Sequence, residues 1–336
     1  MTVRDAFRSL STSCPALGSP FMGQLMGVFA ERLCPGTAVS DLVLNWPGDP
    51  TTNADSVPLR LAGALHALKL DGLALSDVYP PKTPSDDALW DAVETALLSH
   101  ETRVLDWLKS PPQTNEVRRS AVVLAGLAEA ARRYPSKDVA LFELGASGGL
   151  NLLADRYQLK LPDLTLGQDN AAVVLNPEWT GPLPHGQLPK VTDRQGVDLA
   201  PLNPTDDADR LRFLAYLWPD QPDRQIRTEL ALAEARKTSV KLDAGDAAHW
   251  LENALPQPDT DSLRVVFHTV AWQYFPEATK SRATAALAAV KTPTLQIGME
   301  ADDTTPGAAI TLTEWPSGTR TALGRADFHG RWIEWY

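Results

Sequence analysis

The sequence predicts an α/β protein in which an all-helical N-terminal domain precedes a mostly parallel sheet that ends in an antiparallel hairpin. Over the first third of the 336 residues, apolar side chains recur at helical spacing. From Val139 onward the pattern changes to short β-type runs separated by helical stretches, which is typical of parallel strands with crossover helices. Near the end, two β-type runs flank Pro316-Ser317-Gly318, a turn that favours an antiparallel hairpin.

The predicted N-terminal domain covers residues 1–110. Ser19 followed by Pro20 marks a helix start, because a serine caps the free amides and proline suits the first helical position. A second start follows Ser85, where two acidic residues suit a helix N-terminus, and its apolar stripe runs on toward residue 107. Pro111-Pro112 ends this helix, since proline lacks an amide donor and restricts the residue before it.

The predicted second domain covers residues 111–336. It opens with an Ala-rich helix that Thr114 or Asn115 caps and that runs to about Arg133. A first strand at Val139–Leu144 and a helix at Leu150–Tyr157 follow. The later expected strands are short apolar or β-branched runs: Thr192–Asp198, Ser239–Leu242, Arg264–Phe267, Thr294–Ile297, Ala309–Trp315, Thr319–Leu323 and Trp332–Trp335. Residues 159–190 are rich in proline, lack clear periodicity and are interpreted as an insertion.

The overall composition restricts the kind of partner. With 42 acidic and 31 basic residues the chain carries a formal net charge of -11, which disfavours a non-specific nucleic-acid surface. No apolar run approaches the roughly 20 residues that span a bilayer, and the N-terminus lacks the layout of a secretory signal. Two cysteines and six histidines show no metal-ligand spacing. We therefore expect a cytoplasmic protein with a small-molecule substrate, no metal, and no nucleic-acid or membrane partner; the sequence does not indicate its oligomeric state.

The strongest local signal is a glycine-rich turn at Gly145-Ala146-Ser147-Gly148-Gly149, which lies between the first strand and a helix. Small residues let the backbone pass close to a ligand, and a helix N-terminus offers unpaired amides to a polar or anionic group. The turn therefore predicts a binding site.

Carboxylates accompany this turn at three successive predicted strand ends. Glu143 lies in the first strand, Asp198 ends the second, and Asp246 follows the third. Each alone is equally consistent with a loop carboxylate or a helix cap, but the carboxyl ends of parallel strands meet at one edge. Three acids in this position favour a shared ligand.

The same segments resemble the class I (Rossmann-like) S-adenosylmethionine-dependent methyltransferases. Those enzymes carry an acidic residue two positions before a G-x-G-x-G turn, and this chain departs from the pattern only at Ser147. The resemblance implies that Glu143 and the turn face the methionine end and ribose, that Asp198 binds the ribose hydroxyls, and that Asp246 contacts the adenine amine. The implied cofactor contacts are Glu143, Gly145, Ala146, Ser147, Gly149, Asp198, Leu199, Asp246, Ala247 and Arg119.

A second resemblance covers nearly the whole chain. The chain resembles an uncharacterised bacterial family, domain of unknown function 2332, which is grouped with methyltransferase-like folds. This implies the architecture and names no reaction. The matching motifs are Pro111 to Val117 with Arg119, the turn at Gly145, Arg194 to Asp198, Trp218-Pro219-Asp220-Gln221, Val266-Phe267-His268-Thr269 and His329-Gly330-Arg331-Trp332.

Several residues near the predicted site are candidates for binding the methyl acceptor or for catalysing methyl transfer. His268 ends the fourth strand and is a candidate proton acceptor, because imidazole titrates near neutrality; a buried structural histidine is the alternative. The other catalytic candidates are Glu116 and His329. Trp272 and Tyr274 are expected to wall the substrate pocket, and polar residues before the Ala-rich helix are expected to close the site: Gln113, Asn115, Glu116 and Arg119.

Two other functions remain open at this point. Gly145 to Gly149 also fits the G-x-S-x-G nucleophile elbow of α/β-hydrolases, with Ser147, Asp246 and His329 in the required order. Helices in place of strands before Val139 disfavour that fold. The chain also lacks the Asp/Asn-Pro-Pro-aromatic signature of amino-methylating enzymes, which leaves a non-catalytic cofactor- or nucleotide-binding module open. We favour a methyltransferase that acts on a small-molecule O or N acceptor.

Overall fold

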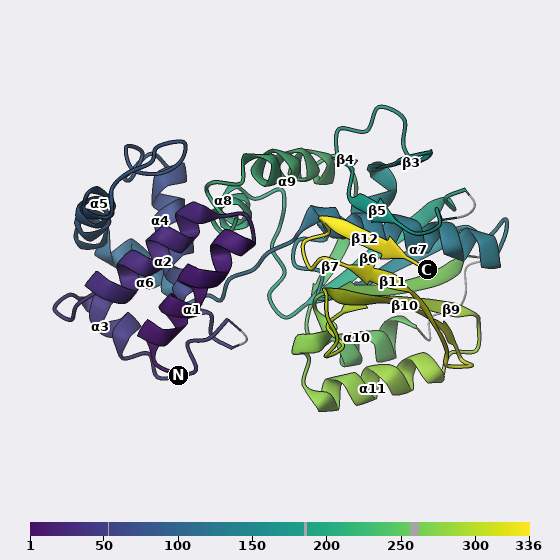
Figure 1. Cartoon of the computed structure of the whole chain (residues 1–336). Coiled ribbons are helices and arrows are strands. Elements are labelled where there is room, and N and C mark those ends of the chain that lie inside the picture. Colours follow the sequence, from purple (N-terminus) through teal and green to yellow (C-terminus); the bar gives the residue numbers. More distant parts are fainter. Residues whose placement is uncertain (53, 185–186, 256–261) are drawn as a thin grey trace. The chain divides into compact units, whose positions relative to one another are not determined.

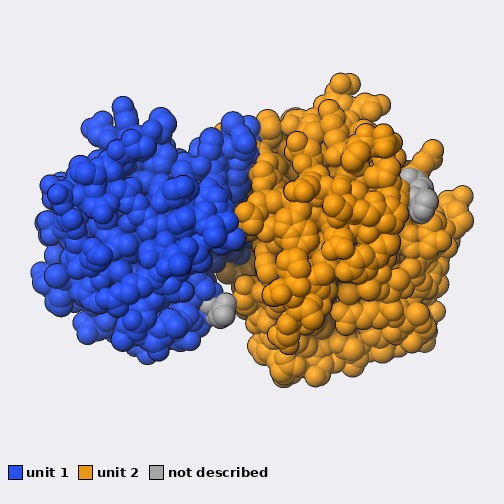
Figure 2. Space-filling model, viewed as in Figure 1, with its two compact units in different colours: residues 1–114, 206–226 blue, residues 115–205, 227–336 orange. Residues whose placement is uncertain are grey.

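The structure is a computed structural model that describes residues 1–52, 54–184, 187–255 and 262–336. The chain forms two compact units (Figure 2). The first comprises Met1–Thr114 and Asp206–Ile226, and the second comprises Asn115–Thr205 and Arg227–Tyr336. Within the described ranges, no helix has both the length and the apolar character needed to cross a membrane.

The regular elements of the first unit are helices that enclose an apolar core. Phe7, Phe29 and Leu65 are among its fully buried side chains. The Ser19 hydroxyl accepts the amide of Met22, as its predicted capping role requires. The stripe predicted after Ser85 is divided into two helices at residue 100. The helices of this unit are α1 (Val3–Ala16), α2 (Pro20–Arg32), α3 (Ala38–Leu44), α4 (Val57–Leu70), α5 (Asp86–Ser99), α6 (Glu101–Leu108) and α8 (Asp207–Ala215).

Residues 206–226 join this unit although the sequence analysis assigned them to the second domain. The Asp220 carboxylate accepts the hydroxyl of Ser19 and, at 2.9 Å, the amide of Phe21. Ala215 and Tyr216 also belong to the helical core. The hydrogen bonds of Asp220 link residues about 200 positions apart in the chain, so no local sequence pattern predicts them.

Nine described strands of the second unit form its large sheet, in the order β5-β12-β11-β10-β9-β8-β1-β6-β7. Neighbours from β7 through β9 pair in parallel, and β9 to β12 pair antiparallel, which confirms the predicted mixed α/β sheet and its C-terminal hairpin. The strands are β1 (Val139–Leu144), β5 (Glu178–Thr180), β6 (Val191–Asp198), β7 (Lys241–Ala244), β8 (Leu263–Thr269), β9 (Thr294–Glu300), β10 (Ala308–Trp315), β11 (Thr319–Ala326) and β12 (Trp332–Trp335).

Helices cover both faces of the parallel part. On one face, α10 (Ala247–Ala254) and α11 (Glu277–Ala288) lie together beneath the sheet (Figure 1) and share a core with Phe142 and Val266. On the other face, α7 (Ser120–Arg133) packs so closely that a side chain at Gly126 would meet Ile297 at 2.6 Å. Burial on both faces explains why every residue of β1 is buried and why its sequence is a continuous apolar run broken only by Glu143.

The order of the parallel strands defines a switch point. From β1 the chain adds β6 and then β7 on one side, and later adds β8 and β9 on the other side. In open sheets of this kind, ligands bind outside the carboxyl ends of the strands where the direction of winding reverses. This point lies at the end of β1, where the glycine-rich turn begins.

The predicted insertion is more regular than its sequence indicated. Outside residues 185 and 186, which are not described, it contains β2 (Gln158–Leu161), β3 (Leu164–Gly167) and β4 (Val174–Leu175), which pair in a separate sheet. Strands of two to four residues carry too few alternations for a period to be recognised. The helix predicted after the glycine turn is a 3₁₀ helix, η2 (Leu150–Arg156).

Candidate functional site at the strand ends

The glycine turn folds back over the end of β6. Gly145, Ser147 and Gly149 all have left-handed backbones, with φ of 71°, 51° and 69°. The amides of Gly145 and Ala146 donate to the carbonyl of Val197 at 2.9 and 3.0 Å. Gly145 is sterically required, since a Cβ there would lie 2.5 Å from the Cβ of Ala271.

Asp198 joins this turn to the end of β6. Its carboxylate accepts the amide of Ser147 at 2.8 Å and that of Ala200 at 3.0 Å. The carbonyl of Asp198 in turn accepts the amide of Gly245, beyond the end of β7. Leu199, the next residue, has 81% of its surface exposed. The structure thus brings together the turn and the second-strand carboxylate that the sequence analysis paired.

Glu143 lies beneath the turn and is almost fully buried. Its carboxyl group receives hydrogen bonds from the side chain of Asn151 and the amide of Leu152, while Oε2 has no partner among the residues that the structure describes. Burial raises the pKa of Glu143 well above its usual value, and the nearby negative charge of Asp198 adds to this effect. The neutral acid is therefore favoured.

Asp246 is used as a helix cap. Its Oδ1 accepts the amide of His249 at 2.9 Å and its Oδ2 accepts the hydroxyl of Thr279 at 2.8 Å. The amide of His249 is the main cause of the lowered pKa of Asp246. The alternative considered for this residue, a capping carboxylate, describes its contacts better than an adenine ligand does. Ala247, the first residue of α10, is buried.

His268 is enclosed by other protein groups rather than directed at a ligand. Nδ1 lies 2.9 Å from Oε1 of Glu300, and Nε2 lies 3.0 Å from the amide nitrogen of Gln296. The indole of Trp315 donates to Oε1 of Gln296, which turns the Gln296 NH₂ toward His268. Nε2 must therefore accept and Nδ1 must donate. Both ring nitrogens are therefore engaged by protein groups, as in the structural alternative considered for His268, and its role as a proton acceptor stays a prediction.

Glu300 fixes the loop after β8. Its carboxylate accepts the amides of Ala271 and Trp272 at 3.0 and 3.1 Å and that of Gln273 at 3.2 Å, in addition to His268. Burial opposes ionisation of Glu300, but these hydrogen bonds outweigh it and lower its pKa.

The loop so fixed carries the two predicted pocket aromatics. It begins at Val270, whose φ of 54° is an outlier for a β-branched residue. The ring of Trp272 stacks on His268 with centroids 5.0 Å apart, and Tyr274 is 57% exposed. Backbone strain of this kind concentrates at functional sites. Gln296 and Trp315 were not among the predicted site residues; a polar glutamine inside an apolar strand was the available signal.

The residues before α7 also hold backbone in place. Oδ1 of Asn115 accepts the amide of Leu150 at 2.8 Å, so this residue caps η2 and not the helix predicted for it. Glu116 caps the short helix η1 (Val117–Arg119). Arg119 donates to the carbonyls of Thr269 and Phe328. These buried side chains therefore support the turn and the β8 end, whereas Gln113 lies in the first unit.

The two remaining catalytic candidates are His329 and Ser147. The amide of His329 donates to Asp327 at 3.1 Å, in a turn that packs against Arg118 through Gly330. Oγ of Ser147 is buried and has no hydrogen-bond partner among the described residues. Among the described residues no histidine hydrogen-bonds to the Ser147 hydroxyl, so these residues do not assemble the Ser-Asp-His arrangement of a hydrolase.

Residues 4–335 match the model of a family described as "Uncharacterized protein conserved in bacteria (DUF2332)". The chain belongs to the DUF2332 family. No curated protein matches it. Because the match covers both compact units, the helices and the sheet are parts of one DUF2332 architecture.

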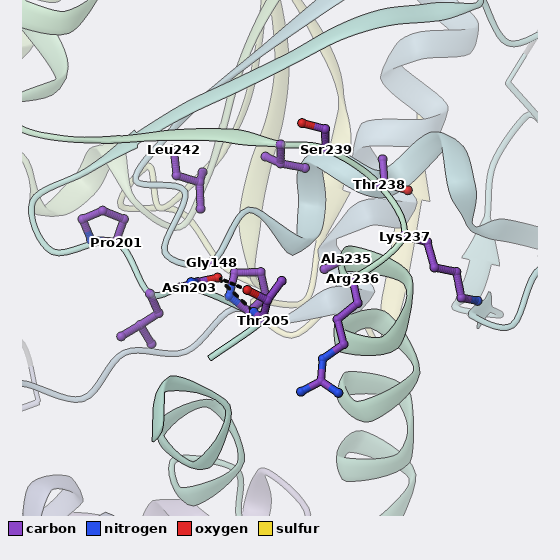
Figure 3. A pocket seen from close by; sticks show the side chains of 13 residues that line it. Gly148, Pro201, Asn203, Thr205, Ala235, Arg236, Lys237, Thr238, Ser239 and Leu242 are labelled. Atoms are coloured by element: carbon purple, nitrogen blue, oxygen red, sulfur yellow. Dashed lines mark hydrogen bonds between the residues drawn. The ribbon is translucent and has the colours of Figure 1, made fainter. Parts of the chain in front are cut away.

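A cavity of about 570 Å³ opens in the second unit of this DUF2332 protein, beside Gly148 of the turn (Figure 3). Its walls are Pro201–Thr205, which follow β6, and Ala235–Val240, which lead into β7, together with Leu242 of that strand. The amide of Leu202 donates to the carbonyl of Ser147 at 3.2 Å, so one wall is anchored directly on the turn.

Proposed function

We propose that this DUF2332 protein binds S-adenosylmethionine at the carboxyl ends of β1, β6 and β7 and is a methyltransferase for a small-molecule O or N acceptor. The observation that carries the proposal is the junction of Asp198 with Ser147 at the switch point of the sheet. There a glycine turn and a strand-end carboxylate meet as in the methyltransferases that these segments resemble.

The residues present fit an adenosyl group. The glycine turn keeps a bare backbone at Gly145, where a side chain would clash with Ala271. Leu199 exposes an apolar surface next to Asp198, suited to one face of a flat ring. Oε2 of Glu143 is a buried polar atom without a hydrogen-bond partner in the described ranges, and such atoms normally have one. The third-second-first-fourth-fifth strand order is that of dinucleotide-binding sheets.

In this proposal the protein supplies binding and orientation. S-adenosylmethionine provides a methyl group on a positively charged sulfur, which is already activated for transfer. Asp198 accepts the ribose hydroxyls, and Glu143, as a neutral acid, offers a hydrogen bond beneath the turn. His268 and Glu300 position the 270–275 loop, which brings Trp272 to the same end of the sheet.

Calorimetry on the full chain tests the binding step. Both S-adenosylmethionine and its demethylated product S-adenosylhomocysteine are expected to bind. Leu199→Ala removes the exposed apolar contact and is expected to weaken both ligands about fivefold. Leu98→Ala is the matched control, because Leu98 is also an exposed leucine, at 57%, on α5. Absence of binding to the unaltered chain ends the proposal, and equal affinities of the two variants remove Leu199 from it.

A non-catalytic module that binds the same cofactor is favoured by one observation: His268, the main candidate base, has both ring nitrogens engaged. That function shares the binding but predicts no turnover. Incubation with methyl-labelled S-adenosylmethionine and a small-molecule cell extract separates the two, since only a methyltransferase moves the label into a new compound.

A further inference from the structure

The cavity beside Gly148 combines an apolar floor with a cationic rim. Leu202, Val240 and Leu242 supply apolar surface, and Arg236 and Lys237 lie at the end of α9 (Pro222–Ala235) and in the loop that follows it (Figure 3). The remaining polar groups are the neutral side chains of Asn203, Thr205, Thr238 and Ser239.

The charge of this lining is opposite to that of the chain. Acidic residues outnumber basic ones by 42 to 31 overall, yet none of the described residues that line the cavity carries a carboxylate. Lys237 contacts Glu234 at 3.4 Å; the Lys237 side chain is 67% exposed and that of Glu234 is 21% exposed, so solvent screens this pair mainly at the lysine. A concave site lined by one sign of charge concentrates ligands of the opposite sign. The cavity is therefore suited to an anion.

A second depression extends this positive surface. It measures about 370 Å³ and shares Lys237, Thr238 and Ser239 with the first. It adds Arg156, Arg194 and Lys241, against the single acidic lining residue Asp193. Arg194 is paired with Asp155. The loop 237–239 thus has basic depressions on both sides, and only the first has an apolar floor and reaches the glycine turn.

We propose that the cavity at Gly148 binds a small organic anion, with an apolar body and one phosphate or carboxylate group, as the methyl acceptor. The acceptor role rests on the proposed function; the anion site does not. The wall that Leu202 anchors on Ser147 and the contact of Gly149 with Val240 and Leu242 place the cavity against the turn. In the transfer, the acceptor's O or N lone pair forms the new bond to the methyl carbon. The sulfur keeps the electron pair of the broken bond, and the acceptor proton passes to water.

Three probes separate the features of the site on the full chain: phenyl phosphate, phenol and inorganic phosphate. Phenyl phosphate is expected to bind about tenfold more tightly than phenol or inorganic phosphate. It alone has both a ring for the apolar floor and a phosphate for the cationic rim. Arg236→Ala with Lys237→Ala is expected to weaken phenyl phosphate about tenfold and to leave S-adenosylhomocysteine affinity unchanged.

Arg320→Ala with Lys291→Ala is the matched control, since it removes one exposed arginine and one exposed lysine outside the cavity lining. The anion site is overturned if both double variants weaken phenyl phosphate binding equally, or if phenol and phenyl phosphate bind with equal affinity. Thr238→Trp fills the cavity and is expected to abolish phenyl phosphate binding alone; loss of S-adenosylhomocysteine as well overturns the acceptor role. If the unaltered chain binds phenyl phosphate but no S-adenosylmethionine, the proposed function fails while the anion site stands.

Discussion

Nδ1 of His268 lies 2.9 Å from a carboxylate oxygen of Glu300, and that carboxylate also accepts the backbone amides of Ala271, Trp272 and Gln273. One acid therefore connects the last residues of β8 to the loop that follows them. Since the other ring nitrogen of His268 faces Gln296, the imidazole is held on both sides and is part of this connection.

Glu300→Gln tests the connection through its pH dependence. The pKa of Glu300 is lowered because its hydrogen bonds outweigh the effect of burial. A lowered pKa means that the stabilisation is present above the unfolded value, near 4.5, and is lost as the pH falls through the folded value. We expect the substitution to lower the free energy of unfolding by about 2 kcal/mol at neutral pH and by less below that value. Urea denaturation over this range measures the difference.

Glu277→Gln is the control, because the Glu277 side chain is 86% exposed. It is expected to leave the stability nearly unchanged at every pH. A stability difference for Glu300→Gln that stays constant into the acid range would show that its charge does not hold the loop.

Gly145→Ala tests the close approach of the glycine turn to the β8 loop. Gly145 and Gly318 share a φ of 71°, so alanine at either position meets the left-handed penalty of about 1–2 kcal/mol. At Gly145 a Cβ would also lie 2.5 Å from Ala271, whereas at Gly318 the nearest atom is 3.7 Å away. Overpacking adds about 1–3 kcal/mol, so Gly145→Ala is expected to be the more destabilising variant in thermal or urea unfolding. Equal losses would mean that the turn moves freely away from Ala271.

Local sequence patterns correctly predicted those strands whose own residues form a distinctive run. The bounds expected for the first and last strands, Val139–Leu144 and Trp332–Trp335, are those of β1 and β12, because continuous apolar or aromatic runs define them. The attachment of Asp220 to Ser19 could not be predicted, since 201 positions separate them. In the site, strand ends located Asp198 correctly. The orientation of His268 depends on Gln296 and Trp315, which the pairing of β9 and β10 brings together.

Ser147→Ala distinguishes the proposed site from a serine hydrolase. Because Oγ of Ser147 is buried and has no hydrogen-bond partner in the described part of the chain, its removal is expected to change the stability by less than about 0.5 kcal/mol or to increase it. The unaltered chain is expected not to react with a fluorophosphonate probe, since no described histidine hydrogen-bonds to this hydroxyl. Labelling that Ser147→Ala abolishes would restore the hydrolase interpretation.

Glu143→Gln tests whether the acid beneath the turn is neutral. Burial raises the pKa of Glu143, so the stability that the protonated acid contributes is complete below the unfolded value, near 4.5, and is lost as the pH rises toward the folded value. Glutamine has the same shape and no charge to lose. The free energy of unfolding of Glu143→Gln, relative to the unaltered chain, is therefore expected to rise by about 1.4 kcal/mol per pH unit in that interval.

Urea denaturation at several pH values from acid to neutral measures this slope, and any constant effect of the substitution cancels from it. Glu178→Gln, at an exposed position of β5, is the control and is expected to give a flat difference. A flat difference for Glu143→Gln would mean that the acid is ionised in the folded chain. The Glu143 carboxylate could then only accept hydrogen bonds. The proposed role of Glu143 as a hydrogen-bond donor beneath the glycine turn would be excluded.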